Sequence, residues 1–77
     1  MKPIERACEI IGSQAKLARS LGVTTPVVNQ WISGIRPIPT ERCPDIERAT
    51  SGQVTCEELR PDLSEQWAYL RGTQKAA

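Results

Sequence analysis

Histidine is absent from this 77-residue sequence, and so is any glycine-rich phosphate-binding loop. Histidine is the side chain that most often acts as a general base in enzymes. The carboxylates are scattered over predicted helix faces, and none of them stands beside a nucleophile that it could activate. We therefore expect neither an enzyme nor a small-molecule substrate.

Cysteine is scarce, with Cys8, Cys43 and Cys56 only. Three widely spaced cysteines without any histidine give no disulfide framework and no zinc-ligand spacing. We predict that all three are buried thiols, and that the chain binds no metal and no cofactor.

Long apolar runs are missing as well. No segment is long enough to span a bilayer, and the N-terminal segment carries Glu5, Arg6 and Glu9 among its apolar residues, unlike a signal peptide. The expected location is therefore cytoplasmic, without a membrane partner.

Net charge is small, at +1, which is low for a domain that binds nucleic acid. Residues 1–42 hold six lysines and arginines against three glutamates, a net +3, whereas residues 43–77 hold four basic against six acidic side chains, a net −2. This asymmetry favours an oriented approach of the basic half to DNA, with weak non-specific binding. The alternative is that the charges only form a solvated surface.

Residues 14–32 contain an amphipathic helix, a tight turn and a second amphipathic helix. In the first helix Leu17, Ala18 and Leu21 share one face. Gly22 can take the left-handed conformation that ends a helix, which places Val23 in the angle between the two helices. This pattern predicts a helix-turn-helix, although any two helices joined by glycine form an αα-hairpin with solvated polar residues.

The second helix is predicted over residues 25–32. Thr24 or Thr25 can cap it with a hydroxyl, and Pro26 lies in its first turn, where the missing N–H costs nothing. The side chains expected to face inward are Val28, Trp31 and Ile32. Those expected to face outward are Thr25, Pro26, Val27, Asn29 and Gln30.

The outward face is the part of such a motif that enters a major groove. Asn29 and Gln30 carry amides that can pair with the N6 and N7 edge of adenine, and a threonine methyl can meet a thymine methyl. Gln14 and Lys16, at the start of the first motif helix, are expected to face phosphates, where free N–H groups also point. Arg36, in the Gly- and Pro-rich loop of residues 33–39, is expected against phosphate too.

Residues 12–34, GSQAKLARSLGVTTPVVNQWISG, resemble the helix-turn-helix of the phage Cro and repressor superfamily. Residues 36–63, RPIPTERCPDIERATSGQVTCEELRPDL, resemble the YdaS-like branch of Cro proteins, small prophage-encoded regulators. The resemblance implies an all-α, five-helix domain that binds double-stranded operator DNA and represses transcription. Some members are described as antitoxin-like, so a cognate toxin is an alternative partner.

Carried over by position, the resemblance implies that Gln14 contacts phosphate. It also implies a set of base-reading residues, namely Thr25, Pro26, Asn29 and Gln30. Pro26 departs from the related motifs, which often place Ser or Gln there. Proline offers only apolar contact to a base at this position.

Three further helices are predicted around the motif. One covers residues 3–11 and should pack over the motif. Another is capped by Thr40, turns Ile46 and Ala49 inward and ends at residues 51–52. The third begins at Thr55, which with Glu58 has the spacing of a capping box, and stops before Pro61.

The DNA-binding domain is expected to end at residue 63, and residues 64–77 form a short, partly flexible extension. Its apolar residues Trp67, Tyr69 and Leu70 need a partner surface. They either fold back on their own domain or form a dimer contact, since a homodimer on a palindromic operator doubles the contacts. In a protein-interaction module, this acidic half would instead be the docking face.

Overall fold

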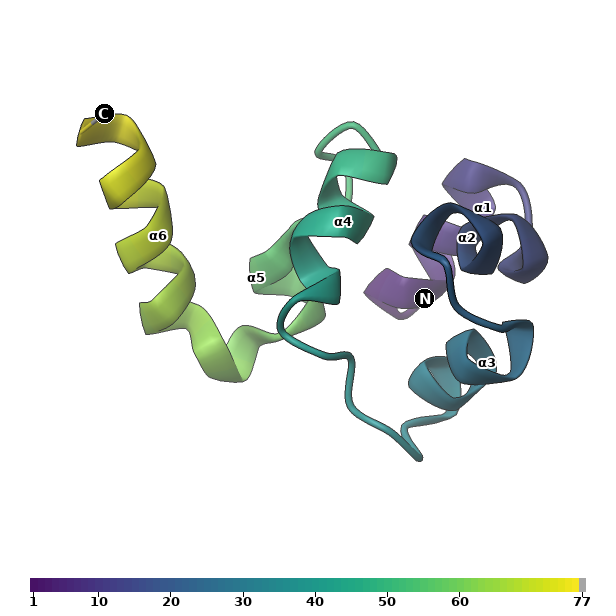
Figure 1. Ribbon diagram of the computed structural model, residues 1–77. Coiled ribbons are helices and arrows are strands. Elements are labelled where there is room, and N and C mark those ends of the chain that lie inside the picture. The colour runs from purple at the N-terminus through teal and green to yellow at the C-terminus, as the bar shows by residue number, and fades with distance from the viewer. Residues whose placement is uncertain (77) are drawn as a thin grey trace.

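Figure 1 shows the computed structural model of the chain, in which residues 1–76 are described, with side chains for residues 1–72. Within that range all regular structure is helical and no strand occurs. The elements are α1 (Pro3–Ile11), α2 (Gln14–Leu21), α3 (Thr25–Ser33), α4 (Arg42–Ala49), α5 (Cys56–Leu59), the 3-10 helix η1 (Pro61–Leu63) and α6 (Ser64–Ala76). The all-α prediction is confirmed.

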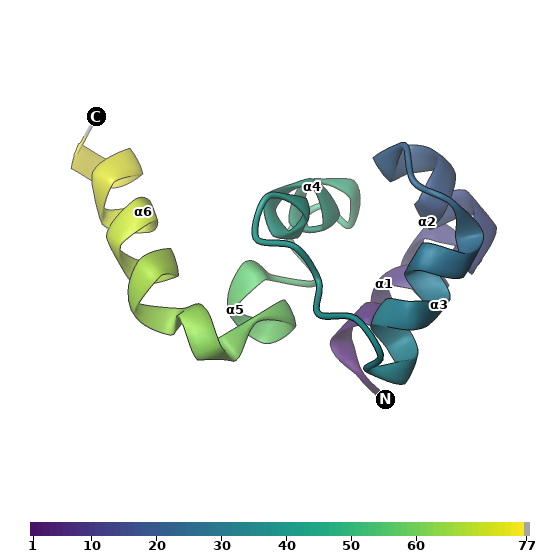
Figure 2. The ribbon, with the colours of Figure 1, turned by 60° about the horizontal axis from the view of Figure 1, so that its bottom comes forward.

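The helices are arranged along a longest dimension of 37 Å. Helices α1, α2 and α3 pack together at one end, α4 and α5 lie in the middle, and α6 lies at the other end (Figure 1, Figure 2). One apolar cluster runs through the molecule, because each helix turns its apolar stripe inward. Its fully buried side chains include Leu17, Val28, Cys43, Ile46 and Val54.

The turn between α2 and α3 forms as the sequence predicts. Helix α2 starts at Ser13, whose Oγ accepts a hydrogen bond from the Lys16 N–H at 3.1 Å, and it ends at Gly22 with φ 72° and ψ 28°. The Val23 N–H donates to the Ala18 carbonyl at 3.0 Å, and the Val23 side chain packs against the core. The turn between α2 and α3 is thereby held by its own backbone hydrogen bonds.

Two predicted hydroxyl caps are wrong. Thr24 is the N-cap residue of α3, but its hydroxyl makes no capping bond, because Pro26 has no N–H and the Val27 N–H donates to the Thr24 carbonyl. Helix α4 begins at Arg42, and Thr40 lies in a preceding turn where backbone carbonyls accept the first N–H groups. Glu41 already has helical φ and ψ, so no extended cap residue exists there.

The short helix α5 has the predicted capping box. The Glu58 N–H donates to Thr55 Oγ1 at 3.3 Å, and the Thr55 N–H donates to Glu58 Oε1 at 3.1 Å. The three cysteines are buried free thiols, as predicted.

The extension contains a sixth helix, α6, which the five-helix prediction did not include. Trp67 anchors it, since its side chain is 3% exposed and its Nε1 donates to the Arg60 carbonyl at 3.0 Å. Arg71 adds a polar tie, because its guanidinium donates to both Glu47 of α4 and Glu57 of α5. Those hydrogen bonds hold the pKa of both carboxyl groups below the usual range.

Candidate nucleic-acid interface

The N-terminal half of α3 presents three of the four predicted base readers to solvent. Thr25, Pro26 and Asn29 are exposed, at spacings that place them on one helix face. Within the described part of the chain, the Asn29 amide makes no hydrogen bond. Its donor and acceptor groups are therefore available to a base edge.

Gln30 and Val27 lie at the edge of this face and are half-buried. The outward placement expected for Val27 is wrong, because its side chain packs against the core beside Val28 and Trp31. Gln30 Oε1 is buried without a hydrogen-bond partner among the described residues. In this conformation Gln30 does not offer both amide atoms to a base, and its role as a reader stays a prediction.

The predicted phosphate contacts lie on either side of α3 in the sequence. Gln14 is half-buried in the first turn of α2, and Lys16 is exposed two residues later. Arg36 is exposed in the loop that follows α3. Their contact with a duplex backbone stays a prediction.

Charged contacts separate the cations into two groups. Of the nine lysines and arginines with described side chains, six donate hydrogen bonds or form ion pairs within the chain: Lys2, Arg6, Arg42, Arg48, Arg60 and Arg71. The other three, for which the described residues provide no such contact, are Lys16, Arg19 and Arg36. All three belong to α2 or to the loop after α3.

Arg19 is the member of this group that the sequence did not assign to the interface. The signal was present, because Arg19 falls on the polar face of α2, one helical turn beyond Lys16. What the sequence could not reveal is which other cations are already engaged. Lys2, Arg6 and Arg42 contribute to the +3 of residues 1–42, yet their side chains are engaged in hydrogen bonds or ion pairs within the fold.

Comparison with known proteins identifies the family. The family described as "Bacterial toxin YdaS" matches residues 4–68 of this chain. The chain belongs to the YdaS family. It is 60% identical over 67 residues to a protein of Escherichia coli strain K12 named "Putative transcriptional regulator YdaS", covering 87% of this chain and 66% of that protein. The chain thus spans slightly less than two thirds of the length of this relative.

A solved structure shares the fold of this YdaS-family chain. The Cro protein from "putative prophage element Xfaso 1" in Xylella fastidiosa strain Ann-1 is similar with a TM-score of 0.76 and 48% identity, over 82% of this chain and 95% of that one. The resemblance to Cro and YdaS proteins predicted from residues 12–63 is therefore confirmed.

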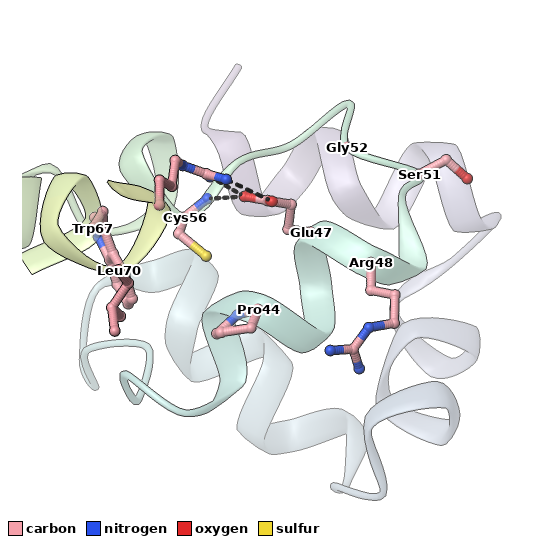
Figure 3. A pocket seen from close by; sticks show the side chains of 9 residues that line it. Pro44, Glu47, Arg48, Ser51, Gly52, Cys56, Trp67 and Leu70 are labelled. Carbon is pink, nitrogen blue, oxygen red and sulfur yellow. Dashed lines mark hydrogen bonds and ion pairs between the residues drawn. The ribbon is translucent and has the colours of Figure 1, made fainter. Parts of the chain in front are cut away.

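A second surface of this YdaS-family chain is a pocket of about 440 Å³ between α4 and α6. Figure 3 shows Trp67 and Leu70 of α6 on one side, with Pro44 and Arg48 of α4 across from them. Trp67 is folded into its own domain, which is one of the two alternatives left open by the sequence. Tyr69 and Leu70 remain 73% and 42% exposed.

Two other kinds of site do not occur among the described residues. No described helix is long and apolar enough to cross a bilayer. No group of three or more cysteine, aspartate or glutamate side chains there is arranged to hold a metal ion.

Proposed function

We propose that this chain is a sequence-specific transcriptional repressor of phage or prophage type, which occupies operator DNA in the cytoplasm with α3 in the major groove. The observation that carries the proposal is the position of Lys16, Arg19 and Arg36. These cations, without intramolecular contacts among the described residues, lie on α2 and in the loop after α3, the elements that precede and follow the helix with exposed Thr25, Pro26 and Asn29. The names of the similar proteins, a regulator and a Cro protein, agree with this role.

Each exposed residue of α3 has a specific task in this proposal. Asn29 pairs through its amide with an adenine edge, and Thr25 contacts a neighbouring base through its hydroxyl or methyl group. Pro26 contributes apolar contact with a thymine methyl. Gln30 contributes if its amide rotates outward, which also relieves the buried, unpaired Oε1.

Affinity in this proposal comes from the duplex backbone. Gln14 and the free N–H groups at the start of α2 bind one phosphate, and Lys16, Arg19 and Arg36 neutralise others. With about three neutralised phosphates per chain, the logarithm of the binding constant should fall with the logarithm of salt concentration with a slope of roughly −3 for each bound chain. Such shallow dependence is consistent with the net charge of +1.

The test is selection of duplexes from a randomised pool by the purified chain, followed by titration of the selected duplex and a scrambled one at several salt concentrations. A repressor enriches a defined sequence and binds it at least about a thousandfold more tightly than the scrambled duplex. Equal, weak binding to both duplexes that vanishes with modest salt would remove the DNA-reading role.

We also propose that two chains bind one palindromic operator, because a single recognition helix reads only a few base pairs. Of the predicted contact residues, Trp67 supports the surface from beneath, and Tyr69 and Leu70 make the contact. The mass of the complex with the selected duplex measures this directly. One chain per palindrome at saturation would contradict it.

A second candidate is an antitoxin-like protein-interaction module, in which the helix-turn-helix serves only autoregulation. The pocket between α4 and α6 favours it, because it joins apolar walls to charged groups and no residue of α3 lines it. The family description calls the family itself a toxin, which agrees with a toxin and antitoxin pair but not with the antitoxin half of it. In that case L70D abolishes co-purification with the product of an adjacent gene and N29A does not, whereas a repressor without such a partner co-purifies with nothing.

A further inference from the structure

Each helix of the helix-turn-helix has, in its last turn, a carbonyl group that accepts a hydrogen bond from a cationic side chain outside the motif. Lys2 Nζ donates to the Ile32 carbonyl, in the last turn of α3, at 2.5 Å. The Arg42 guanidinium donates to the Leu21 carbonyl, the last residue of α2, at 2.8 Å. These bonds span 30 and 21 residues of sequence.

The two cations tie the motif to helices that do not belong to it. Lys2 is the N-cap residue of α1. Its backbone N–H donates to Glu5 Oε1 at 2.9 Å, which fixes the position of the Lys2 backbone from which the side chain extends. Arg42 is the first residue of α4, and its guanidinium lies 3.9 Å from Asp45. A carbonyl at a helix C-terminus lacks an intrahelical donor and carries the negative end of the dipole, so a cation is favourable there.

We infer that Lys2 and Arg42 are positioning residues that set how α3 is presented to the major groove, and so determine the preference for the operator and not the affinity for DNA of any sequence. The inference rests on the proposed DNA-binding function. Helix α3 is held by the turn at Gly22 at its N-terminal side and by Lys2 at its C-terminal side. Arg42 fixes α2, the helix from which that turn emerges.

Selectivity is sensitive to such ties because base readout tolerates little displacement. A hydrogen bond from Asn29 to a base edge needs donor and acceptor within about 2.7–3.2 Å, and a reading group must be held to about half an ångström. Phosphate contacts made by long side chains such as Lys16 adapt to a shift of that size. Loosening α3 should therefore reduce the preference for the selected duplex more than the binding of any duplex.

The experiment compares K2M and R42M with the unchanged chain, on the duplex selected from a randomised pool and on a scrambled duplex, at several salt concentrations. We expect the ratio of the two binding constants to fall about fivefold or more in each variant, with scrambled-duplex binding and the salt slope unchanged within twofold. K2R, which can still donate to the Ile32 carbonyl, should keep most of the ratio. K16M is the matched control, because it removes one cation that binds no carbonyl. It should weaken binding to both duplexes equally and reduce the salt slope by about 0.9 for each bound chain.

An unchanged ratio in K2M would overturn the inference, and so would equal weakening on both duplexes with a shallower slope, since that result marks a phosphate contact. Lys2 is exposed, so K2M decides the question even if R42M does not fold, as checked by circular dichroism. If the unchanged chain enriches no sequence from the pool, the proposed function itself fails. A chain that selects a sequence but loses no ratio on K2M fails only the positioning inference.

Discussion

Asn29 and Gln30 are adjacent amides with the same chemistry and different exposure. Helical periodicity predicts which face of a helix a residue occupies only to within about one neighbouring position. Helix α3 buries a wider stripe than its apolar pattern predicts. Val27 joins the core, and Gln30, three residues on along the same edge, is drawn half inside. Asn29 is therefore the residue on which we expect base readout to depend most.

Replacing Asn29 with alanine tests that order. Loss of a bidentate contact to a base costs about 1–3 kcal/mol, so N29A should bind the selected duplex roughly 5- to 150-fold more weakly and the scrambled duplex as before. Gln53 is an exposed amide in the loop between α4 and α5, and Q53A is the matched control with no expected effect. Equal binding by N29A and the unchanged chain, measured by fluorescence anisotropy, would remove Asn29 from the readers.

The cysteines provide a residue-scale test of the core. Burial is the main cause that raises the pKa of the Cys43 thiol to about 11 and that of Cys56 to about 12. Because the thiolate is the reactive form, we expect neither cysteine to be alkylated by iodoacetamide at pH 8 in the folded chain, and both to react in denaturant. Mass spectrometry after timed labelling measures this, and rapid labelling of Cys43 in the native state would contradict the packing of α4.

At the scale of elements, local signals were sufficient where a helix boundary depends on its own residues. Gly22 ends α2, and Thr55 with Glu58 starts α5, because left-handed glycine and the capping box involve neighbours in sequence. The start of α4 was misplaced, because its first donors bind backbone carbonyls in a turn that no side chain announces. Helix α6 was missed because its anchor, the bond from Trp67 to the Arg60 carbonyl, exists only after the chain has folded back.

Arg71 makes the attachment of α6 dependent on pH. Glu47 and Glu57 have folded pKa values lowered from 4.5, first of all by the hydrogen bonds from Arg71. Groups with a lowered folded pKa stabilise the fold above the unfolded pKa, and this stabilisation is lost as the pH falls through the folded pKa. The free energy of unfolding should therefore decrease as the pH falls below about 4.5.

Removing the guanidinium should weaken that dependence. We expect the free energy of unfolding of R71M to be about 1 kcal/mol lower at pH 7, because partly exposed ion pairs contribute little. Its stability should also decline less steeply in acid. R48M, which removes an arginine paired only with Asp45 at 3.5 Å, is the control and should leave the acid profile of the unchanged chain. Urea titrations at pH 7 and pH 4 compare the three chains, and parallel profiles for R71M and the unchanged chain would exclude the Arg71 cluster as the cause.

For the whole molecule, the arrangement of charge matters more than its sum. A net charge of +1 argues weakly against a DNA-binding domain, but the sum does not show where the unengaged cations lie. Six of the nine described cations make hydrogen bonds or ion pairs within the chain, and the other three, Lys16, Arg19 and Arg36, lie on α2 and in the loop after α3. Sequence counts could not separate these two groups, because the partners of Lys2, Arg6 and Arg42 lie 21 to 52 residues away.

The length of the molecule leads to a prediction about the operator. Helices α3 and α6 lie at opposite ends of a body whose longest dimension is 37 Å. Two chains that meet through Tyr69 and Leu70 on α6 therefore place their recognition helices far apart, at most about 74 Å, twice that dimension. Since half-sites must face the same side of the duplex, we expect a separation of two helical turns, about 68–72 Å, and not one turn of about 34–36 Å.

Footprinting of the selected duplex measures the spacing. Half-sites one turn apart would show that the pair forms through a face nearer α3, and L70D would then leave the two-chain complex intact.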